Sequence, residues 1–233
     1  MQAIAVGLIN FTGLESLKLN GNGFGFDGCR YLLKTLSSST CIRSLELSAN
    51  NIGDDGAEIL GELLHHHQSV EELFLDSCLI GNYGIEKLGE AIESNRSLLK
   101  LNLSNNRFTY SGIDRFMLYL RLNGKLQSID LSNNNLGADG VRSVGEMLLY
   151  NDSLRVLNVS RTNMMSGRSA MGIHAIGAAL RTKNKALNEL YLNFNNLRDE
   201  IVLEFAYALY FNRGLLVCDL KGNHISEEWF KPK

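Results

Sequence analysis

Apolar residues recur along the chain in a pattern that combines two spacings. In the segment that begins at Leu126, the apolar residues Leu126, Ile129 and Leu131 alternate with polar ones, and small or apolar residues spaced by four then run from Gly140 to Leu148. Alternation is typical of a strand with one buried face, and a spacing of four is typical of one helix stripe. The segment therefore predicts a short strand followed by an amphipathic helix.

The same unit is repeated along the chain, with starts 28 residues apart except for a 33-residue sixth unit. A single unit cannot bury both apolar faces, so the units must stack on their neighbours. We expect one domain over residues 1–233, with 1–13 as the end of a preceding repeat or an N-terminal cap, 14–214 as seven repeats and 215–233 as a partial eighth. The repeat starts are Leu14, Ile42, Val70, Leu98, Leu126, Leu154, Leu187 and Leu215.

A polar or small residue stands eight positions after each start, where the strand ends. An asparagine at this position carries N–H donors and an acceptor oxygen that can satisfy the backbone of adjoining turns. The residues at this position form a row from repeat to repeat, which we call the asparagine ladder. Cysteine and threonine make fewer hydrogen bonds, so we expect the ladder to be weakest at Cys78 and Thr162. The predicted ladder residues are Asn22, Asn50, Cys78, Asn106, Asn134, Thr162, Asn195 and Asn223.

A glycine opens each expected helix in the first five repeats, and we expect it to let the helix approach its strand closely. In the sixth repeat the equivalent Gly172 comes four residues late, which predicts an inserted loop from Asn163 to Met171. In the seventh repeat Ile201 replaces the glycine, which predicts a shifted or opened start of that helix.

The motif LxxLxLxxNxLxxxG, followed by a helix and repeated every 28 residues from Leu14 to about Ile225, resembles the leucine-rich repeats of the ribonuclease-inhibitor type. The resemblance implies an α/β solenoid shaped as a horseshoe, with a parallel β-sheet on the concave face and helices on the convex face. Proteins with such repeats include ribonuclease inhibitor, the Ran GTPase-activating protein and the sensing region of cytosolic immune receptors. The resemblance therefore implies function only by class.

Aromatic and charged residues fall at strand positions that should face the concave side. Aromatic anchors are what protein-binding surfaces favour, and methionines of the inserted loop can adapt to irregular partners. The alternatives are that the aromatic residues pack on one another and that the loop is a tolerated insertion. The predicted partner-binding residues are Phe74, Asp76, Asp130, Arg161, Met164, Met165, Arg168, Tyr191 and Phe194.

Charge is distributed unevenly, although the formal net charge is only −2. Residues 42–97 contain eleven acids and three cations, whereas residues 154–186 contain six cations and no acid. A solvated helix face is one explanation for such runs. The coincidence of the basic run with the inserted loop marks the sixth repeat as a candidate for function.

Three motifs invite other interpretations that the repeat pattern disfavours. Residues 23–28 read GxGxxG before a helix, but two of these positions belong to the repeat itself. Consecutive histidines at 65–67 fan out around a helix end that we expect to be solvated, and they cannot all face one ion. The cysteines have no CxxC spacing, so we expect reduced thiols, with Cys78 and Cys218 buried. We expect no catalytic residues, no cofactor and no metal.

These patterns favour a non-enzymatic protein–protein interaction scaffold that is a subunit or segment of a larger assembly. The alternatives are a GTPase activator resembling the Ran GTPase-activating protein and a ligand-sensing repeat region of a larger receptor. We expect the partner to be another protein, with no nucleic acid, no membrane and no small-molecule substrate. The chain carries no signal peptide pattern, and we expect it in the cytoplasm, with a cytoskeletal or axonemal setting by analogy only.

Overall fold

The computed structural model describes residues 13–36 and 40–226. The expectations for residues 1–12 and for the end of the partial eighth repeat therefore lie outside the described residues.

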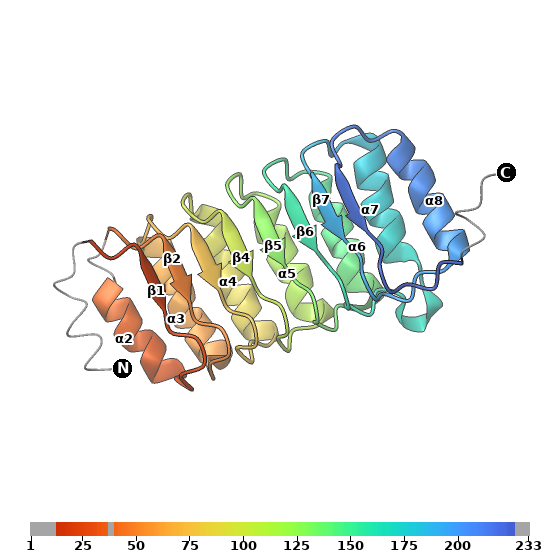
Figure 1. Cartoon of the computed structure of the whole chain (residues 1–233). Helices are drawn as coiled ribbons and strands as arrows, with labels where there is room; N and C mark the ends of the chain where they lie inside the picture. The colour runs from red at the N-terminus through yellow and green to blue at the C-terminus, as the bar shows by residue number, and fades with distance from the viewer. Residues whose placement is uncertain (1–12, 37–39, 227–233) are drawn as a thin grey trace.

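Short strands, one in each repeat, form a single parallel sheet in chain order (Figure 1). Each strand residue pairs with the same position of the next repeat, as Leu17 does with Leu45. The register also holds across the longer sixth repeat, where Leu157 pairs with Leu190. The predicted parallel sheet is confirmed. The strands are β1 (Ser16–Lys18), β2 (Ser44–Glu46), β3 (Glu72–Phe74), β4 (Lys100–Asn102), β5 (Ser128–Asp130), β6 (Val156–Asn158), β7 (Glu189–Tyr191) and β8 (Val217–Asp219).

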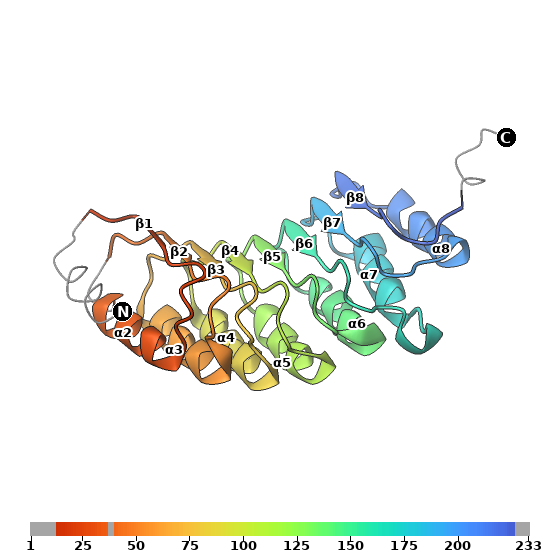
Figure 2. The same cartoon turned by 60° about the horizontal axis from the view of Figure 1, so that its bottom comes forward.

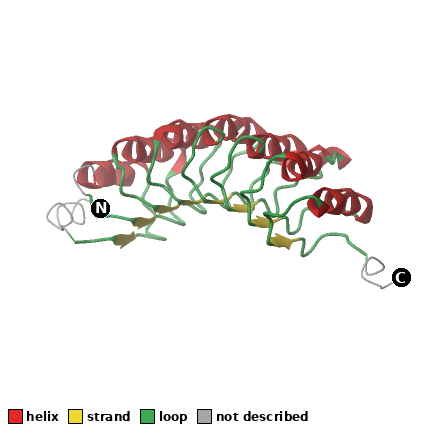
Figure 3. Cartoon of the chain, turned by 90° about the horizontal axis from the view of Figure 1, so that it is seen from above, coloured by secondary structure: helices red, strands yellow, loops and turns green. Residues whose placement is uncertain are grey.

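A helix follows each of the first seven strands and packs behind the sheet, so that strands and helices form two layers (Figure 2). Seen from above, the helices form the outer, longer arc and the strands the inner one (Figure 3). The expected solenoid, concave on its strand side, is confirmed. The helices are α2 (Phe26–Leu36), α3 (Gly53–His66), α4 (Asn82–Ser94), α5 (Tyr110–Leu120), α6 (Gly137–Leu148), α7 (Met171–Thr182) and α8 (Asp199–Tyr210).

The hydrophobic core lies between the two layers and is continuous along the solenoid. Strand residues such as Leu45 and Leu73 are at most 1% exposed, because strands and helices of both neighbouring repeats cover them. The last described strand, β8, is packed against a neighbouring strand on one side only. Cys218, which we expected to be buried, is only partly buried because β8 is the last strand of the sheet among the described residues.

Gly84 and Gly112 face the preceding helix, which corrects for these two the expectation that a helix glycine brings each helix close to its own strand. A Cβ on Gly84 would lie 2.9 Å from the Cα of Asp54 in α3, and one on Gly112 would lie 2.7 Å from the Cα of Asn82 in α4. Real Cβ atoms do not approach other atoms so closely. Glycine therefore sets the spacing between consecutive helices.

Helix α8 lacks this glycine and has the partly buried Ile201 in its place. Figure 3 shows the last helix set apart from the row formed by the others. Further along, a Cβ on Gly177 would lie 3.3 Å from the Cβ of Ala208, which is closer than most Cβ contacts. Helices α7 and α8 therefore meet at this later position.

No helix of the described residues combines the length and the apolar character needed to cross a bilayer.

Candidate functional site

The concave surface is formed by the first and third residues of each strand, whose side chains point away from the core. Between β3 and β7 this surface contains a hollow of about 290 Å³. Three predicted residues, Phe74, Asp130 and Tyr191, line it together. The floor is formed by strands β4 to β6, including Lys100, Ser128, Val156 and Asn158.

The two aromatic residues of the hollow are each held by a charged neighbour. The Nζ atom of Lys100 lies 5.1 Å from the centroid of the Phe74 ring, within the range of cation–π attraction. The Tyr191 hydroxyl donates a 2.7 Å hydrogen bond to Oε2 of Glu189, and this bond raises the pKa of Tyr191 above its usual value. Phe74 and Tyr191 therefore present ordered rings rather than free side chains.

The two predicted acids are oriented by hydrogen bonds from neighbouring strands. Asp76 accepts hydrogen bonds from the Ser48 hydroxyl at 2.5 Å and from the Asn102 amide at 3.1 Å. Asp130 accepts one from the Asn158 amide at 3.0 Å. Both carboxylates are half-buried, so they are fixed polar groups in an otherwise mixed surface. Asp76 lies outside the residues that line the hollow.

Arg161 and Phe194 lie together at the edge of the sheet where the strands end. The Cζ atom of Arg161 is 3.9 Å from the centroid of the Phe194 ring. A Cβ on Gly222 would lie 2.3 Å from the same ring, so the ring rests on the glycine of the next repeat. Phe194 remains 42% exposed. The expectation of an exposed aromatic side chain and the alternative of packing on its neighbours are both partly correct.

The inserted loop is mainly structural. Met164 is 1% exposed and packs in the core, so its prediction as a partner-binding residue is wrong. Met165 is partly buried against the same core. A short 3₁₀ helix, η1 (Ser166–Arg168), follows. The side chain of Arg168 lies outside what the structure describes, and the prediction for it stays a prediction.

The basic run of the sixth repeat divides between two surfaces. Arg161 lies at the concave rim, whereas Arg181, Lys183 and Lys185 lie at the end of α7. Arg155 donates from Nη1 to the carbonyl oxygens of Asp152 and Ala186. The run is therefore not a single patch.

The predicted asparagine ladder lies beneath the concave edge. Asn50 donates from Nδ2 to the carbonyl oxygens of Leu19 and Leu47, and its Oδ1 accepts from the backbone N–H of Asn22. Cys78 makes weaker contacts, with its Sγ 3.3 Å from the Leu47 carbonyl oxygen. Another hydrogen bond partly compensates for the missing asparagine at Cys78, because the backbone N–H of Gly53 donates to the carbonyl oxygen of Cys78.

Thr162 makes a similar break in the ladder. Its hydroxyl donates to the Val159 carbonyl oxygen at 2.8 Å, and its own backbone N–H donates to Oδ1 of Asn195. Here too a glycine of the preceding repeat supplies a hydrogen bond, since the N–H of Gly137 donates to the Thr162 carbonyl oxygen. Gly53 and Gly137 both have positive φ, which an unstrained non-glycine residue rarely adopts.

A second ladder at the opposite edge of the solenoid was missed. Its members are buried and stand three residues before the last five repeat starts: Asn95, Asn123, Asn151, Asn184 and Asn212. Asn151, for example, donates to the carbonyl oxygens of Leu120 and Asn123 and accepts from the N–H groups of Ser153 and Leu154. The constant register of these asparagines was the available signal.

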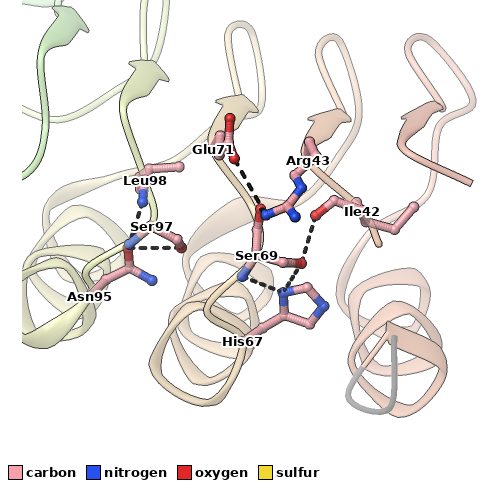
Figure 4. A network of polar contacts seen from close by, with 8 residues as sticks. All are labelled: Ile42, Arg43, His67, Ser69, Glu71, Asn95, Ser97 and Leu98. Atoms are coloured by element: carbon pink, nitrogen blue, oxygen red, sulfur yellow. Dashed lines mark hydrogen bonds and ion pairs between the residues drawn. The ribbon is translucent and has the colours of Figure 1, made fainter. Parts of the chain in front are cut away.

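His67 holds the same position in the repeat before Asn95 (Figure 4). Its Nδ1 accepts from the backbone N–H of Ser69 at 3.4 Å, as Oδ1 of Asn95 accepts from Ser97 at 3.0 Å. His67 is 4% exposed, which corrects the expectation of a solvated histidine run. It is a ladder residue, separate in role from the exposed His65 and His66.

The glycine-rich motif at residues 23–28 has a packing explanation. A Cβ on Gly25 would lie 2.7 Å from the carbonyl oxygen of Asn51 in the next repeat, and Gly23 has a φ of +66°. Loop packing and backbone conformation account for both local glycines. Within the described residues, no group of three or more His, Cys, Asp or Glu side chains is arranged to hold a metal ion.

Comparison with known proteins agrees with this architecture. A family model described as "Leucine Rich repeat" matches residues 38–61, 94–117, 122–145 and 183–206. No curated protein matches the sequence.

Two solved structures resemble the chain. The tropomodulin C-terminal domain from Caenorhabditis elegans has a TM-score of 0.54 and 16% identity, over 66% of this chain and 92% of that one. "Leiomodin-1 Actin-Binding Site 2 (ABS2)" has a TM-score of 0.49 and 16% identity, over 76% of this chain and 84% of that one. Because the repeats recur in sequence and stack in register in space, the chain is a leucine-rich-repeat protein.

Proposed function

We propose that the chain is a protein-interaction scaffold within a larger assembly and that its concave hollow between β3 and β7 docks a segment of another protein. The observation that carries the proposal is the convergence of Phe74, Tyr191 and Asp130 on one hollow from strands far apart in sequence. Solenoids use their concave surfaces in this way because curvature exposes many side chains to one partner.

The chemistry of the hollow suits an extended peptide with alternating apolar and polar side chains. Two ordered rings offer apolar contacts at opposite ends, which an aliphatic or aromatic side chain can occupy. Lys100 offers a positive charge and Asp130 a negative one, so the polar side chains of the bound peptide would include both an acid and a base. The Arg161–Phe194 stack would extend the contact toward the rim.

A cytoplasmic location belongs to the same proposal. Cys29, Cys78 and Cys218 are free thiols. Free thiols are typical of reducing compartments.

The test uses a photo-crosslinking amino acid in place of Ser128, at the floor of the hollow, and in place of Tyr83, on the convex face of α4. The partner captured through position 128 is identified and its affinity for the purified chain is measured. Replacement of both Phe74 and Tyr191 by Ala is expected to weaken binding by about tenfold or more, because central aromatic anchors dominate such interfaces.

The matched control replaces Tyr83 and Tyr110 by Ala, two exposed aromatic residues on the convex face. This control should bind the partner normally. Equal affinity of the Phe74 and Tyr191 double variant, with an unchanged circular dichroism spectrum, would exclude the hollow as the docking site.

A further inference from the structure

A second surface with features of an interface shares no residue with the lining of the concave hollow and lies at the C-terminal ends of helices α5 to α8. The second asparagine ladder joins these ends, so they form one continuous edge. Large apolar side chains that are 45% to 69% exposed follow this edge: Leu122, Tyr150, Tyr207, Tyr210 and Phe211. Scattered apolar residues are ordinary on a surface, whereas apolar side chains gathered along one edge are a feature of interaction surfaces.

Cations stand over these rings. The Cζ atom of Arg121 lies 3.5 Å from the centroid of the Tyr150 ring, and Nζ of Lys183 lies 5.7 Å from the same centroid. Tyr150 thus has cations from the ends of both α5 and α7. Further along the edge, Arg181 lies 5.9 Å from the Tyr207 ring and 5.8 Å from the Phe211 ring.

These three cations have no acidic partner within the described residues. The ion pairs found there involve Lys18, Arg43, Lys87, Arg142 and His174, so none includes Arg121, Arg181 or Lys183. Lys185 is different, because its Nζ donates to the carbonyl oxygens of Leu180 and Phe211 and so ties two helix ends together. The other three can each take a carboxylate without losing an existing ion pair.

The edge is also hollowed. One hollow of about 350 Å³ lies between Tyr150 and Lys183, and one of about 840 Å³ is lined by Arg181, Leu203, Tyr207 and other residues of α8. Apolar side chains could enter these hollows while acidic ones meet the cations beside them.

We infer that the edge formed by Arg121, Tyr150, Arg181, Lys183, Tyr207 and Phe211 is a docking surface for an acidic segment of a partner protein that also carries aromatic or leucine side chains. Charge complementarity argues for this occupant, because cations without ion pairs alternate with exposed rings. A nucleic acid fits less well, because the hollow beside Arg181 is walled by Leu203, Ala206 and Tyr207, whereas phosphates bind to runs of cations.

The test measures binding of a short fluorescein-labelled peptide of alternating glutamate, leucine and phenylalanine by fluorescence anisotropy. One matched peptide has lysine for glutamate, and another has serine for the apolar residues. The acidic apolar peptide is expected to bind more tightly than either. Its binding should weaken with added salt, since the attraction is between exposed charges.

The decisive variants are Arg181→Glu with Lys183→Glu, and Tyr207→Ala with Tyr210→Ala. Each pair is expected to weaken binding by about tenfold or more. The charge control, Arg107→Glu with Arg115→Glu, changes exposed cations elsewhere and should bind as the native chain does. The double variant of Phe74 and Tyr191 should also bind normally, because it alters the other surface.

Equal binding by the charge-reversed pair would overturn the proposal, provided circular dichroism shows the fold intact. Tighter binding of an oligouridine than of the acidic peptide would overturn it in favour of nucleic acid. Sedimentation that shows self-association abolished by Arg181→Glu would instead identify a second copy of the chain as the occupant.

Discussion

The hydroxyl of Ser166 accepts a 3.0 Å hydrogen bond from the backbone N–H of Ala138. The inserted loop of the sixth repeat thereby satisfies the first turn of α6, the helix of the repeat before it. Helix starts leave N–H groups without intrahelical partners, and a side-chain oxygen at this place acts as a cap. The lengthened loop thus has a role within the fold.

We predict that Ser166→Ala destabilises the chain by about 1 kcal/mol, the usual cost of a lost helix cap. Urea unfolding followed by circular dichroism measures the change. Ser128→Ala, at the half-exposed floor of the concave hollow, is the control and should leave stability nearly unchanged. A stable Ser166→Ala variant would show that water replaces the hydroxyl at α6.

The second ladder should contribute as much to the stability of the fold as the first. Asn151→Ala removes two donated and three accepted hydrogen bonds at a buried site. Each buried backbone group left without a partner costs about 1 to 3 kcal/mol, so we expect a loss of several kcal/mol in unfolding free energy. Asn51→Ala, at an exposed position, is the control. Similar unfolding midpoints for the two variants would contradict a structural role for the ladder.

The breaks in the first ladder predict that substitutions at its different positions lower the free energy of unfolding by unequal amounts. Asn134 donates to the carbonyl oxygens of Leu103 and Leu131 and accepts from the N–H of Asn106, whereas Cys78 makes only weak contacts through sulfur. Replacement by Ala should therefore cost clearly more at Asn134 than at Cys78, by about 1 kcal/mol or more. Differential scanning calorimetry of the two variants tests this order, and the reverse order would refute it.

Two buried thiols predict a loss of stability at alkaline pH. Burial raises the pKa of Cys29 to about 12 and that of Cys78 to about 11, from about 9. A raised folded-state pKa favours the unfolded state once that state begins to lose the proton. The stabilisation is therefore complete below about pH 9 and is lost as pH rises toward 11 and 12.

Urea unfolding measured from pH 8 to 11 should show a declining free energy, by up to about 1.4 kcal/mol per pH unit for each thiol. The variant with Cys29→Ala and Cys78→Ala should show a shallower decline, whatever its stability at neutral pH. Identical slopes for both proteins would assign the decline to tyrosines and lysines instead. Iodoacetamide labelling at mild alkaline pH should likewise modify these two thiols only on unfolding.

The repeat pattern predicted the fold because strand pairing follows the same register throughout. Once Leu17 and its equivalents are aligned, the order of strands, the core and the first ladder follow, even across the 33-residue unit. The sequence also placed Phe74, Asp130 and Tyr191 on the concave side. Whether they share one hollow depends on the curvature of the sheet, which helix spacing sets and a repeat alignment does not contain.

Two errors came from assigning side chains within a repeat without their neighbours. Met164 occurs in an insertion, yet apolar side chains of adjacent repeats close over it. The helix glycines were assigned to contact within one unit, but Gly84 and Gly112 meet the helix before. The aromatic edge at Tyr150 and Tyr207 was missed because it joins helix ends from several repeats.

The unbroken register of the sheet bears on how the molecule could change in length over generations. Since every strand presents the same positions to both neighbours, removal of one complete 28-residue unit would bring Leu73 opposite Ile129 with unchanged pairing. Duplication would be equally simple. Because the hollow at β3–β7 and the helix edge at α5–α8 are formed by overlapping repeats, such a change within them would alter both surfaces at once.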